Sequence, residues 1–134
     1  MLLNTATTSR LYPATPVDVV IVEDEQTSRR VLDRLLLASG YRTVSFGTAE
    51  EALSWFDQGP RPQYAVVDLD LPGMNGLQFI DRLRFHSPET HAILVTATDE
   101  QTLTRKTRGL HVPYLRKPLD FNRLLLTMTG TADP

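Results

Sequence analysis

The chain has 134 residues, of which 41% are hydrophobic, and this is enough for one domain with a proper core and too little for a second. Its formal net charge of −2 excludes nucleic-acid binding through bulk electrostatics, so any such contact would need a local basic surface. Cysteine is absent, which excludes disulfides, thiolate catalysis and thiolate metal sites.

The start of the chain is rich in Thr, Ser, Ala and Pro and offers little to bury. We expect residues 1–16 to form a flexible leader, because such a segment cannot offset the entropy of ordering. It has no early positive charge and no sustained apolar run, so it does not resemble a signal peptide. No segment reaches the roughly 18 continuous apolar residues of a membrane span, and the expected location is the cytoplasm, without membrane contact.

Short apolar runs alternate with amphipathic patterns from residue 17 to residue 128. The runs VDVVIV, RTVSF, YAVVD, AILVT and VPYLR have the length of strands. Apolar residues at helical spacing follow four of them: Val31, Leu32, Leu35 and Leu36; Ala52, Leu53, Trp55 and Phe56; Leu77, Ile80 and Leu83; and Leu124, Leu125 and Met128. A polar helical segment runs from about residue 99 to 108. The sequence therefore predicts five strands alternating with five helices.

This alternation predicts an α/β fold in which parallel strands form one sheet with helices on both faces. In such sheets, ligands bind beyond the carboxyl ends of the strands, at the point where the strand order reverses. Polar residues collect at these ends, namely Glu23 and Asp24 after the first strand, Asp68 at the third, Thr96 at the fourth and Lys117 after the fifth. We therefore expect residues far apart in the sequence to meet at one edge of the sheet.

Carboxylates, a hydroxyl and an ammonium at one edge suit a hard cation together with a phosphoryl group. Mg²⁺ prefers oxygen ligands and keeps several waters, so few protein ligands suffice. Asp24 and Asp68 are the expected direct ligands, and Glu23 is expected to act through water. Asp70 is expected to offer its backbone carbonyl.

A carboxylate at the end of a buried strand is costly unless a cation or hydrogen-bond donors compensate its charge. Asp68 can also act as a nucleophile and form an acyl phosphate. Lys117 would then neutralise the phosphoryl oxygens, and Thr96 would donate a hydrogen bond to them. This chemistry explains why a strand would end on Asp68.

The order and spacing of these motifs are similar to those of a known family. Together the motifs resemble those of the response regulator receiver domain of two-component signalling. They are Glu23-Asp24, Asp68 within VVDLDLPGMNG, Thr96-Ala97, and Tyr114 three residues before Lys117-Pro118. The resemblance covers about residues 17–128. It implies the flavodoxin-like (βα)5 fold of the chemotaxis regulators, which is a doubly wound parallel sheet of five strands in the order 2-1-3-4-5.

The resemblance also implies a role for each matching residue. Asp68 would accept a phosphoryl group from a histidine kinase or a histidine phosphotransfer protein, in a Mg²⁺-dependent reaction. Lys117 would pair with that group, Thr96 would shift toward it, and Tyr114 would turn inward into the space that opens. In the family, this switch alters the surface of the fourth helix, fifth strand and fifth helix, which binds a downstream protein. Such a module is not an enzyme beyond its own phosphorylation and dephosphorylation.

Three features depart from the family's pattern. Glu23 replaces the common aspartate, which moves the carboxylate but keeps its charge. The fourth-helix segment TDEQTLTRKTRG has little apolar surface beyond Leu103, so this helix is expected to be short or displaced. Pro113 removes a backbone donor where the fifth strand begins. We therefore expect an unusual output surface or none, and the oligomeric state stays open.

Two other functions stay open beside the phosphoacceptor. A pseudo-receiver would bind a protein constitutively, without phosphorylation. A small phosphatase would use Asp68 and Asp70, although the domain offers no cap over the site. The basic run Arg105, Lys106 and Arg108 predicts a solvated helix face, and His86, His91 and His111 lack metal-ligand spacing. Residues 129–134 are predicted to be a tail, which fits a stand-alone receiver and part of a longer protein equally well.

Overall fold

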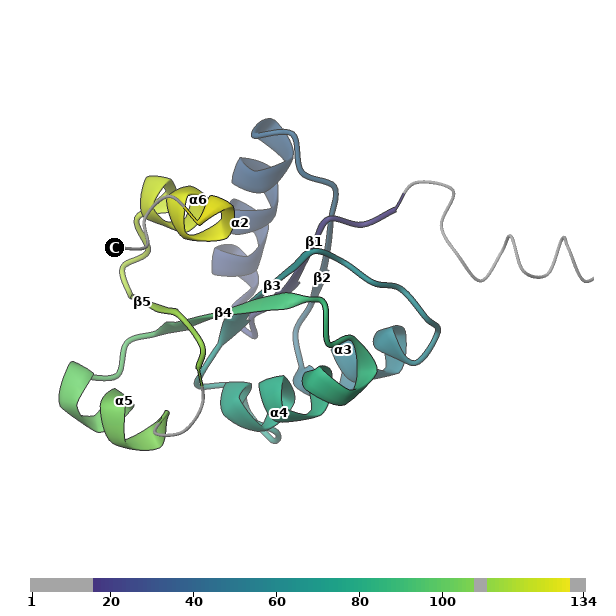
Figure 1. Cartoon of the computed structure of the whole chain (residues 1–134). Helices are drawn as coiled ribbons and strands as arrows, with labels where there is room; N and C mark the ends of the chain where they lie inside the picture. The colour runs from purple at the N-terminus through teal and green to yellow at the C-terminus, as the bar shows by residue number, and fades with distance from the viewer. Residues whose placement is uncertain (1–15, 108–110, 131–134) are drawn as a thin grey trace, which may run out of the picture.

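A parallel sheet of five strands forms the centre of the computed structural model, which describes residues 16–107 and 111–130. The strands are β1 (Val19–Val22), β2 (Thr43–Phe46), β3 (Tyr64–Asp68), β4 (His91–Thr96) and β5 (Tyr114–Arg116). The helices are α2 (Gln26–Ala38), α3 (Ala49–Phe56), α4 (Gly76–His86), α5 (Glu100–Lys106) and α6 (Phe121–Thr129). The strand order β2-β1-β3-β4-β5 confirms the predicted doubly wound fold (Figure 1).

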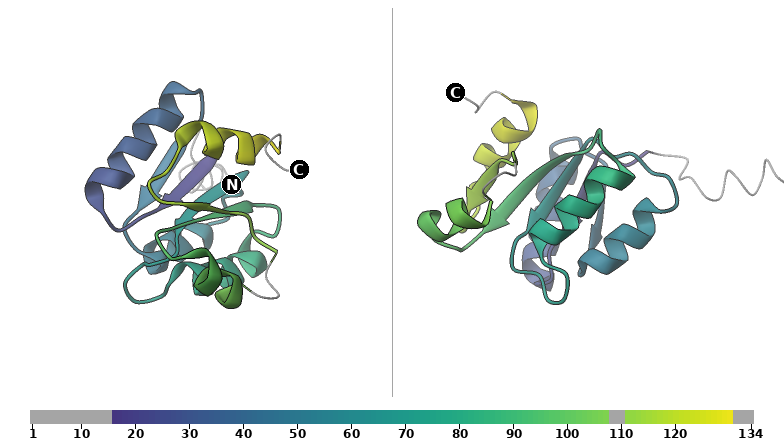
Figure 2. Two further views of the ribbon diagram at one scale, coloured as in Figure 1. Left: turned by 90° about the vertical axis from the view of Figure 1, so that its left-hand side faces the viewer. Right: turned by 60° about the horizontal axis from the view of Figure 1, so that its bottom comes forward.

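Helices cover both faces of this sheet, with α2 and α6 on one face and α3, α4 and α5 on the other (Figures 1 and 2). Strand β1 contributes to both layers of the core, because successive side chains point to opposite faces. Val20 and Val22 belong to the cluster beneath α3 and α4, whereas Val19 and Ile21 belong to the cluster beneath α2 and α6. Such full burial stabilises the fold by about 1.5–3 kcal/mol for each aliphatic side chain. This explains why VVIV is continuously apolar rather than alternating.

The pairing register brings the carboxyl ends of the central strands to one level. Val22 pairs with Val67, so the residues that follow β1 lie beside the end of β3. Asp68 pairs with Val95, one residue before the end of β4. The predicted meeting of polar residues at one edge follows from this register.

The stretch VVDLDLPGMNG leaves the sheet at Asp68 and begins α4 within a few residues. Asn75 accepts a hydrogen bond from the Gln78 amide at 2.9 Å, and the Gln78 side chain accepts one from the Asn75 amide at 3.0 Å, which completes a capping box. Gly76 is required because a Cβ there would lie 2.4 Å from the Asp68 carbonyl oxygen. The first turn of α4 therefore packs directly on the backbone of the predicted phosphoacceptor.

Three strand predictions were too long, and in one of them the second strand begins at Thr43 rather than at residue 42. The fifth strand begins at Tyr114 rather than at Val112, because Pro113 has no N–H to donate, although its carbonyl still accepts from the Leu94 amide at 2.9 Å. The first strand begins at Val19 rather than at residue 17. The polar fourth helix of the family corresponds to α5, which has seven residues and buries Leu103, in agreement with the expected short helix.

The apolar stripe predicted on α2 is only partly buried. Leu32 and Leu36 are buried, but Val31 is 51% exposed and Leu35 is 40% exposed. These two residues lie beside the groove between α2 and α6 rather than beneath the sheet. No helix in the described ranges is long and apolar enough to cross a membrane. The predicted leader and tail, and Arg108, lie largely or wholly outside the described residues.

Candidate functional site

The acidic residues predicted from the sequence meet at the carboxyl edge of the sheet. Glu23 and Asp24 follow β1, and Asp68 ends β3. One carboxylate oxygen from each lies within 4.8 Å of the other two. Glu23 and Asp68 are buried, with 7% and 5% exposure, whereas Asp24 is exposed. The site therefore has a buried inner side and a side open to solvent.

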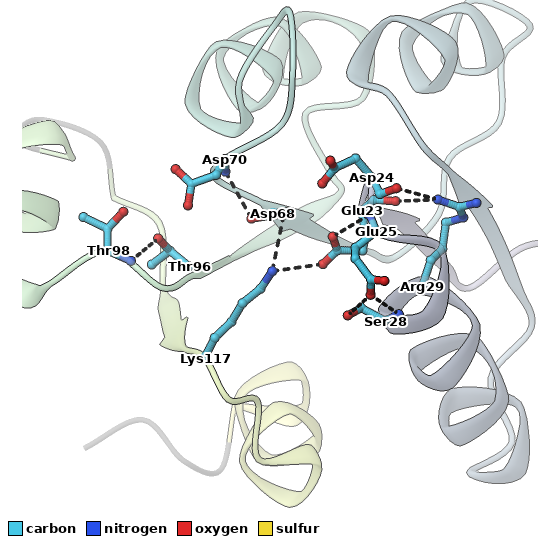
Figure 3. A network of polar contacts seen from close by, with 10 residues as sticks. All are labelled: Glu23, Asp24, Glu25, Ser28, Arg29, Asp68, Asp70, Thr96, Thr98 and Lys117. Atoms are coloured by element: carbon cyan, nitrogen blue, oxygen red, sulfur yellow. Dashed lines mark hydrogen bonds and ion pairs between the residues drawn. The ribbon is translucent and has the colours of Figure 1, made fainter.

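Lys117 compensates the two buried carboxylates. It reaches from the segment after β5 to a position between them, as Figure 3 shows. Its Nζ lies 3.2 Å from Glu23 Oε1 and 3.4 Å from Asp68 Oδ2. The other oxygen of Asp68 accepts a hydrogen bond from the Asp70 amide at 3.1 Å. The cost of burying Asp68 is thus offset by one cation and one backbone donor.

Burial and neighbouring charges shift two pKa values in the site. Burial raises the pKa of Glu23, and the charge of Asp68 adds to this, while the Glu25 amide and Lys117 act against it. Burial alone would lower the pKa of Lys117, but the charges of Asp68 and Glu23 outweigh it and hold the pKa above its ordinary value. Lys117 is therefore charged at neutral pH, and Glu23 binds a proton more readily than an ordinary glutamate does.

The loop after β1 is held by hydrogen bonds that the sequence did not reveal. Glu23 Oε2 accepts from the Glu25 amide at 3.1 Å. Arg29, on the first turns of α2, donates from Nη1 to the Glu23 carbonyl at 2.8 Å and to the Asp24 carbonyl at 3.5 Å (Figure 3). Arg29 thus fixes the backbone that carries two of the carboxylates.

The predicted switch residues lie on neighbouring strands. Thr96 is fully buried at the end of β4, and its Oγ1 accepts from the Thr98 amide at 2.9 Å. Tyr114 begins β5 and is half-buried, and its hydroxyl donates to Glu100 Oε1 on α5 at 3.5 Å. The sequence did not predict Glu100 as the partner of Tyr114.

The donor atoms fit a magnesium ion. All three side chains offer carboxylate oxygens, which Mg²⁺ prefers, and opposite ligands of one ion lie about 4.2 Å apart. A spread of up to 4.8 Å is slightly wider, which suits two direct ligands and one that acts through water. The Asp70 side chain points away from Asp24 in Figure 3, and its backbone amide donates to Asp68. Among the described residues, no second group of His, Cys, Asp and Glu has such a spacing.

An apolar cavity of about 330 Å³ opens beside the acidic residues. Val31 and Leu35 of α2 form one wall, and Leu119 and Phe121 beside α6 form another. Glu23, Asp68 and Lys117 also line it. The buried carboxylate of Asp68 can therefore be approached along an apolar surface.

The fold and the site together define a doubly wound α/β protein with a buried, lysine-paired aspartate next to two further carboxylates. The chain belongs to the response regulator receiver domain family, which its residues 19–129 match. Receiver domains are signalling modules of two-component systems, and the predicted family is thus confirmed.

Three comparisons show which known proteins the chain and its fold are similar to. It is 35% identical over 112 residues to the transcriptional regulatory protein PcoR of Escherichia coli, and the match covers 80% of this chain and 47% of PcoR. A CheY-like receiver domain protein of Methanospirillum hungatei superposes with a TM-score of 0.78 at 22% identity, covering 89% of this chain and 95% of that one. The regulator TrrA of Thermotoga maritima, solved with Mg(2+)-BeF, gives a TM-score of 0.74 at 24% identity, covering 86% and 98%. The chain spans less than half the length of the curated relatives it matches first.

Proposed function

We propose that the chain is a phosphoacceptor receiver in which Asp68 takes a phosphoryl group from a histidine kinase or a histidine phosphotransfer protein. The observation that carries this proposal is the environment of Asp68, which is 5% exposed, within 3.4 Å of the Lys117 ammonium and beside Glu23 and Asp24. A structural aspartate would not need two further carboxylates in the same place, because each adds repulsion. A cation and a phosphoryl group make such a cluster useful.

In the proposed reaction, a carboxylate oxygen of Asp68 attacks the phosphorus of a phosphohistidine. The new O–P bond forms as the P–N bond breaks, and the imidazole leaves and takes up a proton. Asp24, Asp68 and the Asp70 carbonyl would hold Mg²⁺, with Glu23 acting through water, and the ion when bound would neutralise charge on the phosphoryl oxygens. The cluster of the Glu23, Asp24 and Asp68 carboxylates supports the Mg²⁺ requirement, as does TrrA, which was solved with Mg(2+)-BeF.

Lys117 and Thr96 are proposed to hold the phosphoryl group. The Lys117 ammonium lies between the two buried carboxylates and needs only a small movement to pair with an oxygen on Asp68. The Thr96 hydroxyl accepts from the Thr98 amide, and its own proton is available for a phosphoryl oxygen. Thr96 ends β4, which lies next to β3, and Lys117 follows β5 and already contacts Asp68, so the switch would begin with short side-chain movements.

The proposed output follows from Tyr114. Its hydroxyl contacts Glu100 on α5, so turning the ring inward would break that contact and change the surface of α5, β5 and α6. This surface corresponds to the fourth helix, fifth strand and fifth helix of the family. The partner would be a protein, as the receiver family implies. A phosphorylation-independent binding module is the second candidate, supported by the short polar α5.

Acetyl phosphate and Mg²⁺ provide the test. We expect intact-mass measurement to show uptake of one phosphoryl group by the wild type and none by Asp68→Asn. Asp70→Asn is the matched control, because its side chain points away and its carbonyl is unchanged, so it should still be phosphorylated. Uptake that persists in Asp68→Asn would contradict the proposal. No uptake by the folded wild type, from acetyl phosphate or from a histidine kinase, would favour the constitutive binding module.

A further inference from the structure

A carboxylate outside the acidic cluster holds the loop that carries Asp70. Glu50 lies in the first turn of α3, and its Oε2 accepts a hydrogen bond from the Met74 amide at 3.1 Å. The residue before Met74 is Gly73, whose φ is +72°, and a Cβ there would lie 3.0 Å from the same Glu50 oxygen. The carboxylate is therefore seated closely against the turn at residues 73–74.

The loop between β3 and α4 is attached at both ends by its own backbone and caps. At its start, the Asp70 amide donates to Asp68 Oδ1, and at its end the Gly76 amide donates to the Leu69 carbonyl at 2.9 Å. The Asn75 capping box fixes the first turn of α4. Glu50 adds an attachment from a different helix in the middle of this loop, between Asp70 and Asn75.

We infer that Glu50 is a positioning residue for the metal site: it holds the loop in the conformation that presents the Asp70 carbonyl to Mg²⁺. The inference rests on the proposed function, because that function assigns the carbonyl as a ligand. A backbone ligand can be oriented only through the peptides around it. The Leu69 amide before Asp70 donates to the Val95 carbonyl of β4 at 2.9 Å, and after Asp70 the Met74 amide donates to Glu50 of α3. Groups behind the direct ligands commonly change metal affinity by tenfold or more when removed.

In this inference, the loop is held by the Glu50 oxygen that accepts the hydrogen bond from the Met74 amide, and the charge of Glu50 is not required. The Glu50 carboxylate oxygen is a strong acceptor for a backbone N–H. Glu50→Gln keeps an oxygen in the same place and removes the charge, whereas Glu50→Ala removes both. The two variants therefore separate attachment of the loop from a long-range electrostatic effect on a cation.

The test is a Mg²⁺ titration of the ¹⁵N-labelled chain, followed through the amide signals of Asp70 and Met74. We expect Glu50→Ala to weaken Mg²⁺ binding by about three- to tenfold, since the lost bond is partly exposed. Glu50→Gln should stay within about twofold of the wild type. Glu89→Ala and Glu89→Gln are matched controls, because Glu89 is an exposed glutamate in the segment between α4 and β4, and both should bind as the wild type does.

A second measurement needs no metal. In the metal-free protein, hydrogen exchange of the Met74 amide should speed up about tenfold in Glu50→Ala and change little in Glu50→Gln. Unchanged hydrogen exchange and unchanged Mg²⁺ affinity in Glu50→Ala would overturn this inference and leave the proposed function standing. Equal weakening in both Glu50 variants would overturn it in favour of a charge effect. A wild type that binds no Mg²⁺ would overturn the proposed function together with this inference.

Discussion

Lys117 is the one cation among the described residues that contacts both buried carboxylates of the site. Its removal therefore measures how much its charge contributes to the stability of a fold that buries Glu23 and Asp68. The variant Lys117→Met keeps the apolar stem and removes the ammonium. At an effective dielectric constant of about 20, each of the two contacts corresponds to about 5 kcal/mol of Coulomb energy. Glu23 and Asp68 would then lie together without a counter-charge, which is strongly destabilising.

Protonation of Glu23 limits this loss. Keeping a glutamate with an ordinary pKa of 4.5 protonated at pH 7 costs about 3.4 kcal/mol, because one pKa unit corresponds to about 1.36 kcal/mol. We therefore expect the free energy of unfolding of the metal-free variant to fall by about 2–3 kcal/mol at pH 7. At pH 5, keeping the same glutamate protonated costs only about 0.7 kcal/mol, so the expected loss of stability is no larger than that. The sign follows from the raised pKa of Glu23, since the folded state binds more protons than the unfolded state and gains stability as the pH falls toward 4.5.

Urea denaturation with a metal chelator, followed through the single tryptophan Trp55, gives both values. Lys106→Met is the matched control, because Lys106 is exposed on α5 and its removal should change the free energy of unfolding by less than about 0.5 kcal/mol. A loss of equal size at pH 7 and pH 5 would refute the reasoning. A variant as stable as the wild type at pH 7 would also refute it, because the carboxylates would then not depend on Lys117.

Three further predictions concern the loops around Asp68. In urea denaturation, Gly76→Ala should lower the free energy of unfolding by more than about 2 kcal/mol, because the added Cβ meets the Asp68 carbonyl. Gly130→Ala is the comparison: a Cβ there has open space, but the φ of +79° should still cost about 1 kcal/mol. Arg29→Gln should weaken Mg²⁺ binding by about threefold or more in calorimetry. Mg²⁺ affinity should fall as the pH drops toward the raised pKa of Glu23, because a proton competes for that carboxylate, and a flat profile would contradict this.

Much of the fold could be predicted because its central strands β1 and β3 are buried on both faces. YAVVD is continuously apolar and ends on a charged residue, so both the strand and its end at Asp68 were visible in the sequence. The sheet then brings the ends of separate strands together, which is why Asp24, Asp68 and Lys117 could be assigned to one site. Their common edge is a consequence of parallel pairing and needs no knowledge of side-chain contacts.

The residues that support the site could not be predicted in the same way. Arg29 and Glu50 act through contacts with backbone groups, and each looks like an ordinary charged residue in the first turns of a helix. The two exposed apolar residues of α2, Val31 and Leu35, fit the helical period as well as the buried Leu32 does. Periodicity gives the apolar stripe of a helix, whereas its burial depends on how closely α6 packs beside it.

The chemical position of the phosphoryl group tests the central claim most directly. After incubation with acetyl phosphate and Mg²⁺, borohydride reduction converts an aspartyl phosphate into homoserine, which peptide mass spectrometry locates. The account predicts homoserine at position 68 and at no other aspartate, with none formed when Mg²⁺ is withheld. Homoserine at Asp24 or Asp70, or a Mg²⁺-independent reaction at Asp68, would contradict it.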